Sequence, residues 1–358
     1  MSELFDPIQI RGTRLRNRIF TAPMCQYSVM ARDGVPTSWH LVHLGSIAAG
    51  GSSLVVAEAT AVSAEGRISD RDTGLWNDEQ ADAWRPIAAY VASQGAVPGI
   101  QLAHAGRKAS TWAPWGEEGR HGSIPEEHGG WPTVAPSSIA FDGFAVPTEL
   151  DADGLEAIVS DFADAAARAV RAGFGMVELH AAHGYLLHEF LSPASNRRTD
   201  AYGGSLENRA RLLLRVVSSV RAVIGELPLF VRFSASDWAP TGWDVDACAT
   251  VAGWCADAGA DFFDISSGGN VQADIPIGPG YQVPFAERVK HSTGLPVSAV
   301  GIITEPSQAA EIVRSGRADA VSLARELLRD PHFPLRAAHE LGVDLAYWPP
   351  QYLRARWR

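Results

Sequence analysis

The feature that most restricts the fold is a repeated alternation of short apolar runs with segments of helical pattern. Eight such pairs follow one another along the 358 residues. Repeated strand-helix units favour a parallel sheet covered by helices, and eight of them favour closure into a barrel over an open doubly wound sheet. The length alone also fits two average domains. No glycine-rich dinucleotide motif follows any expected strand, which makes an open dinucleotide-binding sheet the weaker choice. We therefore predict an α/β fold, a single (β/α)8 TIM barrel over residues 1–358.

The expected elements can be placed from the apolar periodicity and the helix-end signals. Strands are expected at residues 17–24, 53–60, 97–104, 176–179, 229–233, 261–266, 296–300 and 320–323, and helices at 39–49, 78–94, 151–171, 205–224, 245–258, 284–290, 306–314 and 333–341. Asp151 suits a helix start, Gly173 a helix end, and Ser205 is a candidate N-cap.

Residues 105–147 interrupt this alternation between the third strand and the third helix. The stretch is rich in Trp, Gly and Pro and has no amphipathic period. A long segment without secondary structure inside a compact domain is usually functional. We predict that this insertion caps the ends of the strands.

Composition excludes several classes of protein. The net charge of −11 and the lack of a basic run argue against nucleic acid as a partner. No apolar run reaches the length of a membrane span, and the first residues lack the pattern of a secretory signal, so we expect a cytoplasmic protein. Cys25, Cys248 and Cys255 are too few and too irregularly spaced for a disulfide framework or a zinc site.

The most reactive set of side chains follows the fourth expected strand, where His180, His183 and Tyr185 occur within six residues. In a TIM barrel the active site forms at the carboxyl ends of the strands. Two imidazoles and a phenol there can polarise a carbonyl and protonate carbon. The residues alone leave two alternatives open, namely core histidines with a packing tyrosine, and a pair of metal ligands.

Other expected strands also end in polar or flexible positions. Gly301 follows the seventh strand and Ala324-Arg325 the eighth, and glycine turns with an arginine suit a phosphorylated ligand. Arg232 lies inside an apolar strand, where an unpaired charge would be costly, so we expect it to face a ligand. Cys25 and Gln101 can each be explained as ordinary core residues, and Arg325 as a surface ion pair.

These residues occur in motifs that extend over essentially the whole chain. The motifs are Ala22-Pro-Met-Cys25, Glu58-Ala-Thr60, Gln101-Leu-Ala-His-Ala-Gly-Arg107, His180-Ala-Ala-His-Gly-Tyr185, the run from Ser195 to Arg209, and Arg325-Glu-Leu. Together they resemble the Old Yellow Enzyme family of flavin-dependent ene-reductases. Cys25-Gln26-Tyr27 is similar to the branch that contains the thermophilic-like and xenobiotic reductases.

The resemblance implies a tightly bound FMN that takes hydride from NADPH, with NADH as the alternative reductant, and delivers it to an activated alkene. It places these residues against the cofactor: Pro23, Met24, Cys25, Ala59, Gln101, Arg232, Gly301, Ala324 and Arg325. Cys25 would tune the flavin potential, and Arg232 would lie at the flavin edge where negative charge accumulates. Alanine at position 324, where the family commonly has glycine, keeps the backbone donor.

The resemblance also assigns the substrate side of the site and implies no metal. His180 and His183 would bind the substrate carbonyl while hydride passes from flavin N5 to Cβ, Tyr185 would protonate Cα, and Tyr27 would contact the substrate. In the tail, residues 342–358, Arg354 is the candidate to reach the active site of a neighbouring subunit in a homodimer or homotetramer. Alternatives are another FMN barrel enzyme, a flavin-binding redox sensor and a metal-dependent hydrolase.

Overall fold

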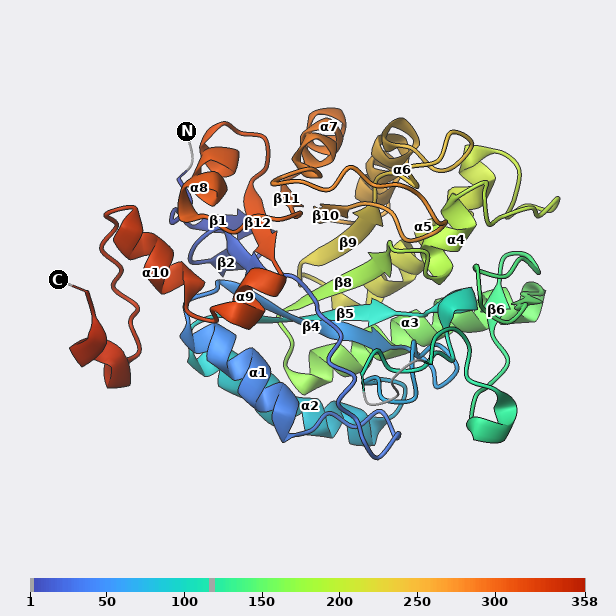
Figure 1. The fold of residues 1–358 in the computed structure, drawn as a ribbon, viewed down its shortest axis with the longest axis horizontal. Helices are drawn as coiled ribbons and strands as arrows, with labels where there is room; N and C mark the ends of the chain where they lie inside the picture. The colour runs from blue at the N-terminus through green and yellow to red at the C-terminus, as the bar shows by residue number, and fades with distance from the viewer. Residues whose placement is uncertain (1–2, 116–119, 358) are drawn as a thin grey trace.

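The centre of the molecule is a closed barrel of eight parallel strands (Figure 1). The computed structural model describes residues 3–115 and 120–357. The barrel strands are β3 (Ile19–Thr21), β4 (Leu54–Ala61), β5 (Val97–Ala103), β8 (Met176–Ala181), β9 (Leu229–Ser234), β10 (Phe262–Ser266), β11 (Val297–Ala299) and β12 (Ala320–Leu323). Each strand pairs with the next one along the chain, and β12 closes the barrel on β3. The predicted (β/α)8 barrel is confirmed.

Helices surround the barrel, as Figure 1 shows. The longer ones are α1 (Ser38–Ala49), α2 (Asp78–Ser93), α3 (Ala152–Ala172), α5 (Leu206–Ile224), α6 (Val245–Asp257), α7 (Val283–Thr293), α8 (Pro306–Arg314) and α10 (Phe333–Glu340). The Asp151 side chain caps α3 by accepting from the Gly154 N–H, and Gly173 ends the helix at φ 90°. Ser205 caps α5 through the Asn208 N–H. The helix-end signals in the sequence therefore marked real caps.

The inside of the barrel consists of layers, because alternate residues of a strand point to the same face. The lower layer, near the amino ends of the strands, is apolar: Phe20, Leu54, Val56, Met176, Phe230, Phe262 and Ala320. The next layer along the strands is polar, and we call it the polar layer: Gln101, Glu178, Arg232, Asp264, Ser298 and Ser322, all buried. The carboxyl ends of the strands lie above it.

A small hairpin closes the lower end of the barrel. Strands β1 (Ile8–Ile10) and β2 (Thr13–Leu15) pair antiparallel, and their apolar side chains join the lower layer. The sequence predicted no strand before residue 17, because strands of three residues carry too little pattern to be recognised. The hairpin removes the lower end of the barrel from water and leaves the carboxyl ends of the strands as the open end.

The insertion after β5 has little regular structure. It contains the 3-10 turns η1 (Gly106–Lys108) and η2 (Glu126–His128) and the strand β6 (Val134–Ala135), which pairs with β7 (Thr148–Glu149). These short elements were not predicted from the sequence, and neither were α4 (Leu186–Leu191), α9 (Arg325–Arg329) and η3 (Pro350–Ala355). Residues 116–119 of the predicted cap lie outside the described part. No helix within the described residues is long and apolar enough to cross a membrane.

Candidate active site

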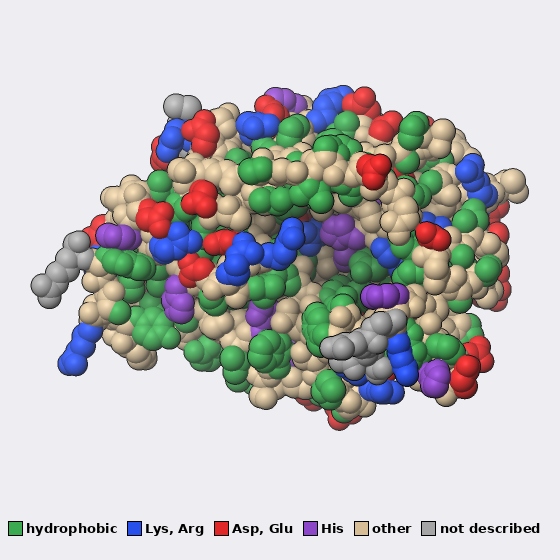
Figure 2. All heavy atoms as spheres, in the orientation of Figure 1, with side chains coloured by type: hydrophobic (Ala, Val, Ile, Leu, Met, Phe, Trp, Pro, Cys, Tyr) green, Lys and Arg blue, Asp and Glu red, His purple; other side chains and the backbone are tan. Residues whose placement is uncertain are grey.

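A cavity of about 340 Å³ opens at the carboxyl ends of β9 to β12. Its lining includes Arg232, Ser266, Gly301, Ala324 and Arg325. In Figure 2 a hollow near the middle of the face brings arginine or lysine side chains together with histidine. The strand-end glycine and the arginines predicted from the sequence as a ligand site thus line one cavity.

Arg232 contributes a buried positive charge to this cavity. Only 7% of the residue is exposed, and its Nε lies 3.0 Å from Asp264 Oδ2. Although it lies close to that carboxylate, this Nε makes no hydrogen bond within residues 3–115 and 120–357. A buried guanidinium with a free donor is costly unless a ligand completes it, so Arg232 fits the electron-rich edge of a cofactor.

Other residues of the cavity lining suit a phosphate group. Gly301 has φ 111°, and a Cβ placed there would lie 2.9 Å from Gln282 Nε2. Ala324 precedes α9, and the exposed Arg325 begins that helix. An exposed guanidinium next to glycine-lined backbone matches phosphate oxygens, so these residues fit the phosphate of FMN.

The fold brings together the three reactive side chains after β8. The His180 ring lies with its centroid 5.1 Å from that of His183 and 4.9 Å from that of Tyr185, both edge to face. His183 Nε2 also lies 2.9 Å from Ser266 Oγ at the cavity wall. The cluster therefore adjoins the arginine-lined cavity.

Burial determines the protonation of this cluster. It lowers the pKa of His180 and His183 well below the usual range, and the charge of Arg232 adds to the effect. Burial also raises the pKa of Tyr185. At neutral pH the cluster therefore consists of neutral imidazoles and a protonated phenol. This set donates hydrogen bonds and holds one transferable proton.

The turn that carries His183 is held from below by a buried pair. His188 Nε2 lies 3.1 Å from Asp237 Oδ1, both side chains are fully buried, and His188 Nδ1 accepts the Gly184 N–H at 3.0 Å. Burial by itself raises the pKa of Asp237, but hydrogen bonds from His188 and Ser192 lower it to about 2. The pair links the loops after β8 and β9.

Close backbone packing fixes the same turn from the side. His183 and Gly184 have positive φ, and a Cβ on Gly184 would lie 2.2 Å from the Gly269 carbonyl oxygen. Lys108 Nζ donates to the carbonyl oxygens of His183 and Gly269, at 2.8 and 2.9 Å. The insertion thus clamps the loops after β8 and β10 together.

Cys25, Tyr27 and Ala59 form a second wall near Tyr185. They pack in one cluster with Tyr185 and the small side chains Ala103, Ala105 and Ala109. Burial raises the pKa of Cys25 well above its usual value, so the thiol is protonated at neutral pH. Pro23 and Met24 lie between the cavity-lining Ala22 and Cys25.

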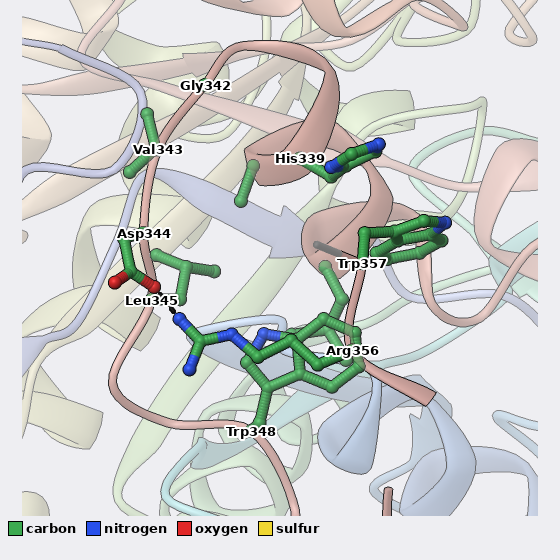
Figure 3. A pocket seen from close by; sticks show the side chains of 10 residues that line it. His339, Gly342, Val343, Asp344, Leu345, Trp348, Arg356 and Trp357 are labelled. Carbon is green, nitrogen blue, oxygen red and sulfur yellow. Dashed lines mark ion pairs between the residues drawn. The ribbon is translucent and has the colours of Figure 1, made fainter. Parts of the chain in front are cut away.

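The tail packs against its own chain. In Figure 3 Trp357 stacks on His339 of α10, with ring centroids 5.0 Å apart, and Arg356 pairs with Asp344. These residues and Trp348 border a cavity of about 360 Å³ that shares no residue with the arginine-lined one. Arg354 lies on the exposed η3. Its predicted contact with a neighbouring active site stays a prediction.

Sequence reasoning missed Glu178, Asp264 and Ser298, which the fold brings into the polar layer beside the predicted Gln101 and Arg232. Gln101 Nε2 donates to Glu178 Oε1 at 2.7 Å, and Ser298 Oγ donates to Asp264 Oδ1 at 2.7 Å. The signal was present, because Glu178 and Asp264 are charges inside apolar strands, like Arg232. Lys108 and the His188–Asp237 pair carried no comparable signal.

Comparison with known proteins identifies the chain's relatives. Residues 3–344 match the model of the NADH:flavin oxidoreductase / NADH oxidase family. The chain is 46% identical to an NADPH dehydrogenase of Bacillus subtilis over 353 residues, 98% of each sequence. It is also 46% identical to an NADPH dehydrogenase of a Geobacillus species, over 96% of each sequence.

Solved structures agree with these matches. An Old Yellow Enzyme homologue from Zymomonas mobilis is 28% identical, with a TM-score of 0.79 over 100% of both chains. Morphinone reductase in complex with tetrahydroNAD is 28% identical, with a TM-score of 0.78, covering 98% of this chain and 94% of that one.

Proposed function

Because the chain belongs to the NADH:flavin oxidoreductase / NADH oxidase family and is an FMN-dependent NAD(P)H oxidoreductase of the Old Yellow Enzyme type, we propose that it reduces the activated C=C bond of α,β-unsaturated carbonyl compounds. The observation that supports this most is the cluster of two neutral histidines and one protonated tyrosine beside the arginine-lined cavity. FMN, when bound, accepts a hydride from NADPH and passes it to the alkene.

Different residues around the cavity would bind different parts of FMN. Arg325, with the backbone at Gly301 and Ala324, would bind the phosphate. Arg232 and Gln101 would bind the polar edge of the flavin ring, while Pro23, Met24, Cys25 and Ala59 would line the ring itself. The buried Nε of Arg232, which makes no hydrogen bond within the described residues, is the observation that favours this placement.

His180 and His183 would bind the carbonyl oxygen of the substrate. Ala182 N–H donates to His180 Nδ1 at 3.2 Å, so the hydrogen of this neutral ring is on Nε2. A neutral donor stabilises the negative charge that develops on the oxygen when hydride reaches Cβ. Because the His180 ring already contacts Tyr185, the bound carbonyl would be held close to the phenol.

Tyr185 would supply the proton to Cα. Its raised pKa keeps the phenol protonated at neutral pH, and the developing enolate carbon is basic enough to take that proton. Tyr27, which packs in the same cluster as Tyr185 and Cys25, would also contact the substrate.

The proposal extends to subunit sharing. We infer that the protein forms a homodimer or homotetramer in which Arg354 enters the active site of a neighbouring subunit. The position of Arg354 on an exposed turn, beside the half-exposed Tyr352 and Leu353, supports this role.

Anaerobic half-reactions test the proposed activity. The purified protein should bleach at the flavin band with NADPH and recover its colour with 2-cyclohexen-1-one, giving cyclohexanone. Tyr185→Phe should leave reduction by NADPH unchanged and slow reoxidation by the enone about 10²- to 10⁴-fold, the usual contribution of a general acid. Equal slowing of both half-reactions would contradict Tyr185 as proton donor, and a flavin that the enone cannot reoxidise would contradict the ene-reductase activity.

A further inference from the structure

Glu178 occupies an unusual position for a carboxyl group. It lies in the interior polar layer, is 1% exposed, and belongs to β8, the strand that also carries His180. Its register partner on β5 is Gln101, whose Nε2 donates to Glu178 Oε1 at 2.7 Å. Below it, Met176 and Phe230 of the lower layer exclude water.

The contact between these two residues orients the Gln101 amide. Because the NH₂ group of Gln101 points to Glu178, its carbonyl oxygen is left to accept a hydrogen bond from another group. A flavin ring has an N–H on its polar edge that requires such an acceptor. As long as Glu178 accepts through Oε1, as it does here, the carbonyl end of the Gln101 amide is the end left for the cofactor.

The charges around Glu178 form a set that does not balance when every member is ionised. Arg232 on β9 is the cation, Asp264 on β10 lies 3.0 Å from it, and Glu178 is a second carboxyl group near the same guanidinium. The histidine above, His180, is neutral. Arg232 and Asp264 alone are neutral together, so an ionised Glu178 would leave the layer with a net negative charge.

We propose that Glu178 is a positioning residue for the flavin, one that orients Gln101 and that sets, by its own protonation, the charge that the polar layer presents to the cofactor. The proposal rests on the proposed contacts of Gln101 and Arg232 with FMN. Neutral Glu178 leaves Arg232 free to stabilise the negative charge of reduction, whereas ionised Glu178 competes for that guanidinium. Reduction is therefore easier when Glu178 carries its proton.

The direction of the pH dependence follows from the environment of the group. Burial, and then the charge of Asp264, raise the pKa of Glu178 to about 8, against opposing contributions from Arg232 and Gln101. Glu178 is thus neutral below about pH 8 and ionised above it. Negative charge on the reduced flavin would raise the pKa of Glu178 further. Between about pH 8 and that higher pKa, reduction should be accompanied by the uptake of up to one proton by Glu178.

Glu178→Gln tests the proposal, because glutamine still accepts from Gln101 and cannot ionise. Above about pH 8, the FMN midpoint potential should fall more steeply with pH in the natural protein than in the variant. The variant should therefore have the higher potential above pH 8, and the two potentials should coincide at lower pH. Infrared spectra of FMN-free protein should contain protonated-carboxyl absorption that titrates near pH 8, and this absorption should lose one component, that of Glu178, in the variant.

Glu189→Gln is the matched control. Glu189 is another buried glutamate whose pKa burial raises to about 8, but it lies on α4 and accepts from the Arg107 N–H. Its replacement should remove a carboxyl band and leave the pH slope of the potential unchanged. Parallel slopes in the natural protein and Glu178→Gln, or no band assignable to Glu178, would overturn the proposal. The potential is measured on the protein with FMN bound, and the infrared spectra on the protein without FMN. Neither measurement uses an alkene, so a failure of alkene reduction would not affect them.

Discussion

The two inner layers of the barrel, although built by the same strands, have opposite character. In the lower layer the Phe230 and Phe262 rings stack at 4.3 Å, and Phe20 lies 5.8 Å from Phe262. Two residues further along the same strands, Arg232 pairs with Asp264. A step of two residues along each strand thus separates an apolar layer from a layer of charged and polar side chains.

This difference shows how the barrel supports a polar site without losing its core. Aromatic side chains in the lower layer bury large apolar areas, and the amino-terminal hairpin covers them. The polar layer contributes less to folding, because buried ion pairs recover little more than their desolvation. We therefore expect substitutions in the lower layer to change stability and substitutions in the polar layer to change cofactor binding.

The largest expected effect is on folding. Phe262→Ala should lower the free energy of unfolding of the FMN-free protein by about 3–5 kcal/mol, because it opens a cavity at a fully buried site. Phe262→Leu should cost less, since most of the volume is kept. Denaturant unfolding measures both. If Phe262→Ala changed the free energy of FMN binding as much as the free energy of unfolding, the two layers would not have separate roles.

A smaller effect is expected on cofactor binding. Arg232→Gln should raise the FMN Kd about 10- to 150-fold, since hydrogen bonds to a charged group contribute about 1.5–3 kcal/mol. Arg221→Gln is the control, because Arg221 pairs with Asp261 at the opposite end of β10. Flavin fluorescence titration gives both constants. Equal losses in the two variants would show that the effect is not specific to the polar layer.

The smallest effect is expected outside the barrel. Arg354→Ala should leave stability and FMN content unchanged, because the side chain is exposed, and should raise the KM for the enone in the oligomer. Arg356→Ala is the control, since Arg356 pairs with Asp344 of its own chain. Steady-state kinetics with size-exclusion chromatography measures both. Unchanged kinetics in an intact oligomer would remove Arg354 from the proposed site.

Much of the architecture was predictable from local pattern. Apolar runs and helix caps predicted the eight strand-helix units, and caps such as Ser205 were found where expected because they act within a few residues. The spacing of His180, His183 and Tyr185 also identified a cluster that the fold confirms. Arg232 could be expected to face the cavity, since a lone charge in a buried strand needs a partner.

The layers of the barrel required the tertiary structure. A strand buried on both faces carries apolar residues on both, so its sequence does not show an alternation that would reveal which residues point inward. The pairing of Glu178 with Gln101, and of Asp264 with Arg232, depends on register between strands that are 30 or more residues apart. The His188–Asp237 pair likewise joins two loops that meet only when the barrel closes. Local sequence thus determined the elements and the reactive cluster, whereas barrel closure and strand register decided which charges surround the cofactor.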